Sequence, residues 1–578
     1  MTPDNKQKLI VYQVFPRIFT NEDGTCVPGG TLEQNGCGKF NDFDGTLLDA
    51  LADLGVNCVW YTGIIEHATK SAFPGIPSDN PHIVKGEAGS PYAIRDYYDV
   101  DPALATDLDR RVEEFRELVK RTHRAGMKAI IDFVPNHTAR RYHSDAAPEG
   151  VEDFGAHDDI TMGFAPQNNY YYITNQQFSP QFSLGTGAEA YHEFPAKATG
   201  NDCFTAFCSE YDWYETVKLN YGHDYWDGSD HFYPVPDTWL KMRDILLFWA
   251  ATGIDGFRCD MVFMVPQPFW HWVTAEVRKK YPHIIFIGEI YAVGLYRPFL
   301  DYCGFDYLYD KVNLYDTLVG IERHGYSAAR LTECWQTVDG IGDRMLNFLE
   351  NHDEVRYASQ EFAGDPRKVT PALVTSAMIS TGPFMIYYGQ ELGEAATENE
   401  GFAGYNNRTT IFDYWSYGTM RRWYDGGKCH EALLSEGERW LRDRYRTVLR
   451  LCNSEKPISR GEFFDLMYVN LQNPDFDPHH LFAFLRYTAD EALLIVANFG
   501  EDDARAKVNV PDLAFSMVGL PEGTLKVSEL LTGEKRTLTL GRNLPSAVTV
   551  GAHDAVVLKV ALPPKEISKN PNNPKSNS

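Results

Sequence analysis

Short apolar runs recur along the first two thirds of the chain, with amphipathic segments between several of them. Eight of the runs are rich in β-branched and aromatic residues and have the length of strands: LIVYQVF, VNCVWYT, KAIIDFVP, GIDGFRCDMV, IIFIGEI, FDYLYDKVN, RMLNFLEN and GPFMIYYG. Residues 110–126 and 269–282, which lie between such runs, have helical periodicity. Parallel strands need helical crossovers, so the pattern predicts a (β/α)₈ barrel.

The spacing of the runs locates an insertion. A βαβ unit takes roughly 30 residues, which is the distance from Asp260 to Glu289. The distance from Asp132 to Asp260 is far longer and includes a stretch rich in Gly, Asn, Gln and Tyr. We therefore expect a barrel from residues 1–139 and 222–456, with an irregular domain, 140–221, inserted after the third strand.

The pattern changes again near the C-terminus. After residue 456 helical periodicity stops, and short alternating runs such as ALLIVANF and AVVLKVAL follow, separated by Gly, Pro and Asp. This alternation predicts an all-β sandwich domain over 457–562. Residues 563–578 are polar and rich in Pro and Asn, which predicts a disordered tail.

Composition narrows the choice of partners and compartment. A formal net charge of -26 disfavours nucleic acid and anionic membranes, because both require clustered Lys and Arg. The ten cysteines have no zinc-type spacing and are expected to be reduced. The first residues show no leader, so we expect a cytoplasmic protein; a periplasmic or secreted chain with its leader removed would look the same.

Polar residues end four of the predicted strands, in DFVPNH (132–137), GFRCD (256–260), GEIY (288–291) and ENHDE (350–354). In a barrel of this class the active site lies where the strands end. Arg258 and Asp260 are two residues apart and should share a face, so Arg258 can hold Asp260 ionised, as a nucleophile requires. A purely structural ion pair is the alternative.

Glu289 ends the apolar run IIFIG, and such a setting would keep it protonated as a general acid. A carboxylate satisfied by backbone N–H groups is the alternative. His352 with Asp353, and His137 with Asn136, would border the same mouth. These residues could also bind a metal, although no HxH or HExxH pattern accompanies them.

Taken in order, the four segments resemble the signature regions of the α-amylase superfamily, glycoside hydrolase family thirteen. The resemblance extends over about residues 8–562 and includes SPYAIRDYYDVDP, VKLN and YYGQE. It implies the same barrel, inserted domain and C-terminal β-domain. The residue roles that it implies are the following: Asp260 as nucleophile, Glu289 as acid/base, Asp353 on the sugar hydroxyls, Arg258, His137 and His352 in the same subsite, Tyr92 stacked beneath the reacting ring, and Asp132 ordering the mouth.

The resemblance also implies a reaction. Two successive inversions would hydrolyse α-1,4-glucosidic bonds of starch-type glucans or malto-oligosaccharides with net retention, and the two reacting carboxyl groups should then lie about 5–5.5 Å apart. A neopullulanase, a cyclomaltodextrinase or a transglycosylase would share these residues, and VKLN is closest to that branch. A non-catalytic, sugar-binding relative is a further alternative.

No cofactor is needed for this chemistry, but many relatives hold a structural calcium ion. Asn136 corresponds to one of its ligands. The Lys-His that supplies another is absent, because this chain reads DMVFMVP after Asp260. Calcium is therefore in doubt there, and TNEDGT (20–25) is a second oxygen-rich segment, which a plain turn explains better.

Overall fold

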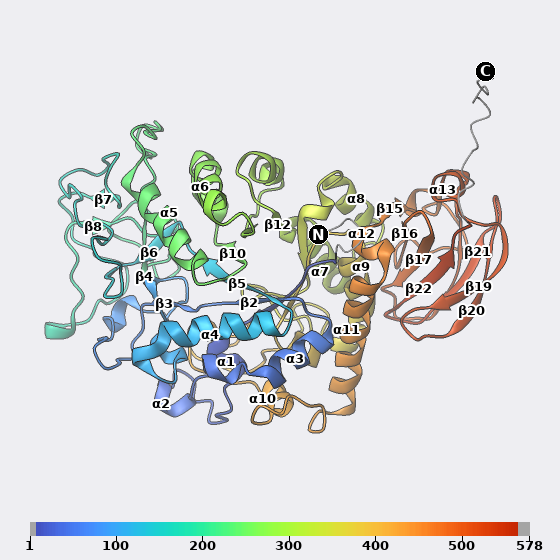
Figure 1. Ribbon diagram of the computed structural model, residues 1–578, viewed down its shortest axis with the longest axis horizontal. Coiled ribbons are helices and arrows are strands. Elements are labelled where there is room, and N and C mark those ends of the chain that lie inside the picture. The colour runs from blue at the N-terminus through green and yellow to red at the C-terminus, as the bar shows by residue number, and fades with distance from the viewer. Residues whose placement is uncertain (1–6, 564–578) are drawn as a thin grey trace, which may run out of the picture.

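A computed structural model describes residues 7–563 of the chain. A closed barrel lies at its centre, the inserted segment lies on one side of the barrel, and an antiparallel β-domain lies on the other (Figure 1). The predicted disordered tail, 563–578, lies outside the described residues apart from residue 563.

Eight parallel strands close the barrel in the order β1-β14-β13-β12-β11-β10-β5-β2. They are β1 (Ile10–Val14), β2 (Cys58–Tyr61), β5 (Lys128–Phe133), β10 (Gly256–Cys259), β11 (Ile285–Gly288), β12 (Tyr307–Tyr309), β13 (Met345–Phe348) and β14 (Phe384–Tyr387). These strands lie within the eight predicted runs, so the predicted (β/α)₈ barrel is confirmed. Their apolar character follows from their burial on both faces.

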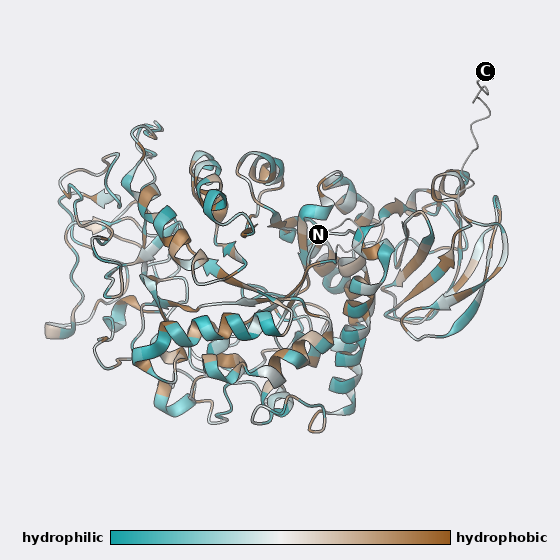
Figure 2. Ribbon diagram, in the orientation of Figure 1, coloured by the Kyte–Doolittle hydropathy of each residue, from teal (hydrophilic) through white to brown (hydrophobic). Residues whose placement is uncertain are grey.

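Helices surround the barrel. The longer ones are α3 (Gly45–Leu54), α4 (Arg111–Arg124), α5 (Asp237–Ala250), α6 (Gln267–Lys280), α7 (Asp316–His324), α8 (Arg330–Thr337), α9 (Thr370–Met378) and α11 (Glu436–Ser454). The shorter ones are α1 (Pro16–Phe19), α2 (Leu32–Asn35), α10 (Gly418–Tyr424) and α12 (Lys456–Arg460), whereas the short helix α13 (Asp512–Val518) lies in the C-terminal domain (Figure 1). Hydrophobic and hydrophilic residues are divided in the same way. Figure 2 shows hydrophobic (brown) barrel strands inside and a largely hydrophilic (teal) α4 outside. On α4, Phe115, Leu118 and Val119 form the buried side.

Residues at the ends of α3 show how local sequence positions a helix. Asp44 caps its first turn by accepting a hydrogen bond from the Leu47 N–H at 3.0 Å. Gly55 ends the helix with a φ of +107°, which a side chain would strain. A Cβ on Gly55 would also lie 2.9 Å from the Leu449 Cβ, so glycine lets α11 approach α3 closely.

A long segment leaves the barrel after β5 and returns at α5. It contains β6 (His137–Ala139), β7 (Tyr172–Ile173), β8 (Ala196–Lys197) and β9 (Thr216–Lys218), and it has a small core that includes Phe178, Tyr191 and Cys208. Antiparallel pairing of β6 with β9 places Lys218 opposite His137. A second hairpin, β3 (Ile65–His67) with β4 (Ile94–Val100), precedes β5 and was not predicted from the pattern.

The C-terminal domain is all-β, as predicted. Its six-stranded antiparallel sheet has the order β15-β16-β17-β22-β19-β20, and β18 pairs with β21 as a second, two-stranded sheet. The strands are β15 (Glu462–Asp465), β16 (Leu481–Tyr487), β17 (Glu491–Asn498), β18 (Ala504–Val508), β19 (Gly523–Glu529), β20 (Lys535–Leu540), β21 (Ser546–Val550) and β22 (Asp554–Ala561). The domain contacts the barrel through α9 and α12.

The helices and the cysteines can be compared with what the composition predicts. Within residues 7–563 no helix is both long and apolar enough to cross a bilayer. All ten cysteines lie in this part of the chain and are unpaired thiols, which agrees with the expected reduced state.

Candidate active site

A buried arginine lies at the centre of the barrel mouth. Arg258, on β10, is 1% exposed, and its Nη1 donates to Asp260 Oδ1 at 2.8 Å. Its Nε donates to the Tyr309 hydroxyl of β12 at 3.2 Å. Arg258 and Asp260 therefore lie on the same side of the chain, as the alternation along a strand predicts.

The same guanidinium reaches two further carboxyl groups. Arg258 Nη2 lies 2.7 Å from Glu289 Oε2, and Nη1 lies 3.6 Å from Asp132 Oδ1. The register of the barrel explains this, because Arg258 pairs with Asp132 on β5 and with Ile287 on β11. Residues from three adjacent strands therefore meet at one cation.

Glu289 is not in the apolar environment that its sequence predicts. Besides Arg258, its Oε2 accepts the Met261 N–H at 2.9 Å, and its Oε1 accepts the Tyr291 hydroxyl. Met261 follows Asp260 in a left-handed conformation, with a φ of 43°, at the turn where its N–H meets Glu289. The apolar residues of IIFIG form part of the barrel wall, whereas Glu289 projects from the end of that wall among polar groups.

The two carboxyl groups therefore do not have the opposed environments that we expected. Burial and the nearby charge of Glu289 raise the pKa of Asp260, while Arg258 lowers it. Two buried carboxyl groups on one guanidinium leave an excess negative charge. This excess favours the protonated form of Asp260.

Asp132 has a supporting position. Its Oδ2 accepts the Trp60 indole N–H at 3.1 Å and the Gly63 N–H at 3.2 Å, and its Oδ1 accepts the Tyr92 hydroxyl at 3.4 Å. Burial raises the pKa of Asp132 to about 6. It is absent from the side chains that line the pocket, which agrees with the expected role in ordering the mouth.

His352 is held as a neutral ring. Gln13 of β1 donates from its amide to His352 Nδ1 at 2.8 Å, so Nε2 carries the hydrogen. Nε2 lies 2.6 Å from the Tyr92 hydroxyl and 3.1 Å from Asp353 Oδ2, and the His352 and Tyr92 rings stack with centroids 5.2 Å apart. Burial, followed by the charge of Arg258, lowers the pKa of His352 to about 3.

His137 is also buried and neutral. The Asn136 amide donates to its Nδ1 at 3.1 Å, and the Trp213 ring meets it edge-on with centroids 5.4 Å apart. Burial and the charge of Lys218 lower the pKa of His137 to about 3. Its other ring nitrogen can therefore act as a neutral donor at the pocket.

A pocket of about 270 Å³ gathers most of the predicted site residues. Those that line it are Tyr92, His137, Asp260, Glu289 and Asp353. Arg258 and His352 lie directly behind them, in contact with Asp260 and Asp353. The Asp353 side chain is 41% exposed, whereas that of Glu289 is 3% exposed, so Asp353 is the most accessible to a ligand.

The sequence did not identify the remaining lining residues, which are Lys85, Ser90, Trp213, Glu215, Thr216, Met261, Tyr291, Ile411 and Phe412. Lys85 from the β3–β4 hairpin and Glu215 from the insertion form a nearly buried ion pair at 2.9 Å. Tyr291 lies within GEIY, so its hydroxyl could have been noticed. Phe412 comes from a loop beyond β14 that has no strand-end pattern.

The predicted calcium ligand Asn136 binds a side chain of the protein. The Lys218 ammonium contacts Asn136 Oδ1, lies 2.7 Å from Asp202 Oδ1 and lies 3.2 Å from the Met264 carbonyl oxygen. A carboxylate, an amide oxygen and a carbonyl are ligands that suit calcium. Because the Lys218 ammonium already lies among these oxygen atoms, however, the residues do not fit a calcium ion.

Two other groups of oxygen atoms have local partners. In TNEDGT, Asp23 Oδ1 accepts both the N–H and the hydroxyl of Thr25, which is an ordinary turn. Carboxylates of Glu66, Asp96, Asp99 and Asp145 lie within 4.8 Å of one another. Arg95 lies 3.6 Å from Glu66, and Arg111 binds Asp99, so arginines already offset part of this charge.

Comparison with known proteins identifies this arrangement. The sequence-family model for the α-amylase catalytic domain matches residues 13–455, which include every residue predicted for the site. The chain belongs to the α-amylase family. It is therefore a glycoside hydrolase, as the four strand-end segments indicated.

Similar proteins differ in their specificities. The chain is 23% identical to neopullulanase 2 of Thermoactinomyces vulgaris, over 88% of this chain and 72% of that one. It is 25% identical to an α-glucosidase of Apis mellifera, over 88% of each chain. The structure of a maltogenic α-amylase of Thermotoga neapolitana has a TM-score of 0.62 at 19% identity, over 96% of this chain and 99% of that one, and supports the fold.

The fixed charge of Arg258 predicts a pH effect. Removing it as Arg258→Gln should raise the pKa of Asp260 further, because an adjacent guanidinium favours the ionised form. As the expected nucleophile, Asp260 must be ionised, so the acidic limb of kcat/KM should move to higher pH. The pH profile of kcat/KM on a maltotrioside measures this shift.

The matched control is His352→Gln, which keeps a neutral N–H donor. Because the pKa of His352 is only about 3, this variant should lower the rate without moving the acidic limb. An unmoved limb in Arg258→Gln, or a moved one in His352→Gln, would contradict this electrostatic account.

Proposed function

We propose that this family member hydrolyses α-1,4 bonds of short malto-oligosaccharides. The observation that supports a short substrate is the compact pocket of about 270 Å³ around the three carboxylates. Trp213 and the Lys85–Glu215 ion pair form part of its wall, and the insertion supplies two of these residues. Such a volume suits one or two sugar rings better than a long open chain.

In the proposed reaction, Asp260 attacks the anomeric carbon as the bond to the leaving oxygen breaks. Glu289 gives its proton to that oxygen, and the sugar becomes covalently bound to Asp260. Glu289 then removes a proton from water, which attacks the same carbon and releases Asp260. Two inversions give net retention, and the expected carboxyl separation of about 5–5.5 Å remains a prediction.

The raised pKa of Asp260 is consistent with this sequence of steps. The reactive complex needs Asp260 ionised and Glu289 protonated. A raised pKa favours a proton on Asp260 in the free site, and in this proposal that proton moves to Glu289 when a sugar enters. Met261 and Tyr291 hold Glu289 in place during that change.

Neutral groups around the pair suit a neutral substrate. We infer that Asp353 accepts hydrogen bonds from sugar hydroxyls, because its carboxylate is the most accessible of the three. His137 can donate an N–H group to a hydroxyl oxygen without adding charge, while the neutral His352 ring supports Tyr92 and Asp353 from behind. The apolar face of a sugar can lie on the Tyr92 ring, which lines the pocket.

We also propose that this protein needs no calcium ion beside Asn136, because Lys218 supplies the positive charge there. The Lys218 side chain is 2% exposed and connects β9 to the loop after β10. It thereby holds the insertion against the barrel next to His137, its partner in the β6–β9 pairing.

Glu289→Gln should reduce turnover of maltotriose by about 10²- to 10⁴-fold, the usual contribution of a general acid. Formation of the glycosyl-enzyme from maltosyl fluoride should fall much less, because fluoride leaves without protonation. Steady-state and burst kinetics on both substrates measure the difference. Equal losses on the two substrates would argue against the acid role.

A short substrate predicts a ranking of activities. The kcat/KM per bond should be at least about tenfold higher for maltotriose than for soluble starch, because most bonds of a long chain cannot enter a compact pocket. Product analysis on maltotriose, pullulan and cyclomaltodextrin would also reveal an α-1,6 preference or transfer products. A preference for starch would contradict the proposed substrate class.

Lys218→Ala should lower the free energy of unfolding by about 1–3 kcal/mol, because it leaves the buried oxygen of Asn136 without its donor. It also leaves a cluster of oxygens that could accept a cation. Calcium at about 1 mM should therefore raise the Tm of this variant but not that of the wild type. A wild-type Tm that falls on chelation would refute the proposed calcium independence.

A further inference from the structure

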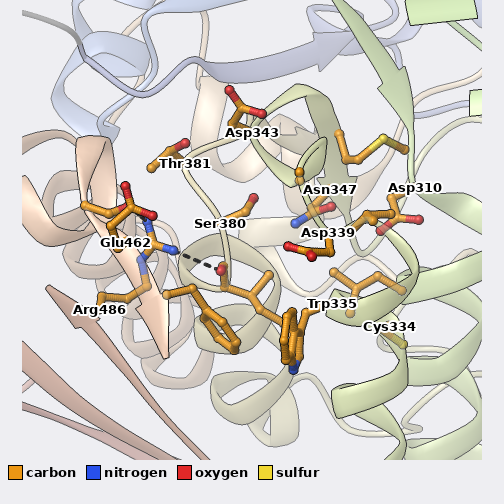
Figure 3. Close-up of a pocket in the computed structure, with 18 of the residues that line it drawn as sticks. Asp310, Cys334, Trp335, Asp339, Asp343, Asn347, Ser380, Thr381, Glu462 and Arg486 are labelled. Carbon is orange, nitrogen blue, oxygen red and sulfur yellow. Dashed lines mark hydrogen bonds between the residues drawn. The ribbon is translucent and has the colours of Figure 1, made fainter. Parts of the chain in front are cut away.

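A second pocket, of about 480 Å³, lies between the barrel and the C-terminal domain. Its lining includes β13, α8, the turn before β14 and the strands β15 and β16 (Figure 3). None of the residues assigned to the reaction lines it.

The wall of the barrel separates this pocket from the catalytic pocket. Tyr309 points into the barrel, where its hydroxyl meets Arg258, and it pairs with Leu346 on β13. Because side chains alternate along a strand, Met345 and Asn347 point outward. Both of these residues line the second pocket.

One end of the pocket offers hydrogen-bond donors. Arg486 is 2% exposed, and its guanidinium donates hydrogen bonds to the carbonyl oxygens of Pro457, Ile379 and Gly461. A guanidinium has five N–H groups, so these bonds leave two for a ligand. Figure 3 shows Arg486 with its dashed bond on one side of the pocket, facing the labelled Asp310 and Asn347 on the other.

The opposite end offers acceptors. Asn347 is 3% exposed, its amide donates to the Ser376 carbonyl at 3.0 Å, and its Oδ1 has no hydrogen-bond partner. An orphaned buried oxygen is costly unless a ligand or water supplies a donor. Asp310 lies beside it, and burial raises its pKa to about 7, so its carboxyl group is partly neutral at physiological pH.

Aromatic side chains form the remaining wall. The Trp335 and Phe463 rings lie with centroids 5.3 Å apart, and both line the pocket. The Trp335 indole N–H is bound to Asp465 at 3.2 Å, which fixes the ring between α8 and the C-terminal domain. A ligand with apolar C–H faces can pack on such a surface.

The charge of the lining excludes the simplest ions. Asp310, Asp339, Asp343 and Glu462 would repel phosphate or another anion, while Arg460 and Arg486 would repel a cation. We propose that this pocket binds an uncharged sugar of one or two hexose rings. Such a ligand both donates and accepts hydrogen bonds, has C–H faces for Trp335, and has a size suited to this volume.

The test uses the full chain with Glu289→Gln, so that bound sugar is not consumed. Calorimetric titration with maltose should then show two sites per chain, one in each pocket. Adding Trp335→Ala should weaken one site roughly tenfold or more, whereas adding Trp440→Ala, a half-exposed tryptophan outside the pocket, should leave both sites. Inorganic phosphate should not bind.

A second variant keeps the test decisive if Trp335→Ala does not fold. Asp339→Trp changes an exposed residue at the rim and should block the pocket without disturbing the core. A single maltose site in the Glu289→Gln protein, two unchanged sites in Asp339→Trp and Trp335→Ala, or tight phosphate binding would overturn the proposal. Maltotriose hydrolysis by the wild type tests the proposed function separately, so the two can fail independently.

Discussion

The buried charge of Arg258 is the constraint on which the rest of the site depends. A guanidinium removed from water is costly unless ionic and hydrogen-bonding partners replace the solvent. Here those partners are carboxyl groups at the ends of three adjacent strands, together with the rings of Trp60, Tyr92 and Tyr309, whose centroids lie 5.2–5.6 Å from the guanidinium carbon. Closure of the barrel is what brings these partners together, so the fold and the site stabilise each other.

The same charge determines which groups can titrate. It lowers the pKa of His352, in addition to burial, and so helps to keep that ring neutral beside Asp353. It also lowers the pKa of Asp260, which burial, followed by the nearby charge of Glu289, nevertheless keeps raised. The mouth of the barrel therefore combines the permanent charge of Arg258 with neutral histidines and a close pair of carboxyl groups. A reaction on an uncharged sugar needs this combination, because protons move while the rest of the charge stays fixed.

The sequence predicted what depends on repeating local patterns. The eight strands were visible because each is an apolar run buried on both faces, and the side shared by Arg258 and Asp260 followed from strand alternation. The setting of Glu289 was predicted wrongly, because its partners are an arginine on the neighbouring strand and the N–H of Met261. Lys85 and Phe412 come from loops whose paths depend on tertiary packing, which no periodicity in the sequence records.

Lys218 makes an interaction between segments that are far apart in the sequence. The residue lies in VKLN, yet its role depends on the pairing of β9 with β6, which brings its ammonium to Asn136 and to the carbonyl of Met264. A bound ion would stabilise this junction only to the extent that free ion is available. In the proposal above, the Lys218 ammonium takes the place of such an ion and holds the insertion beside His137 at any ion concentration.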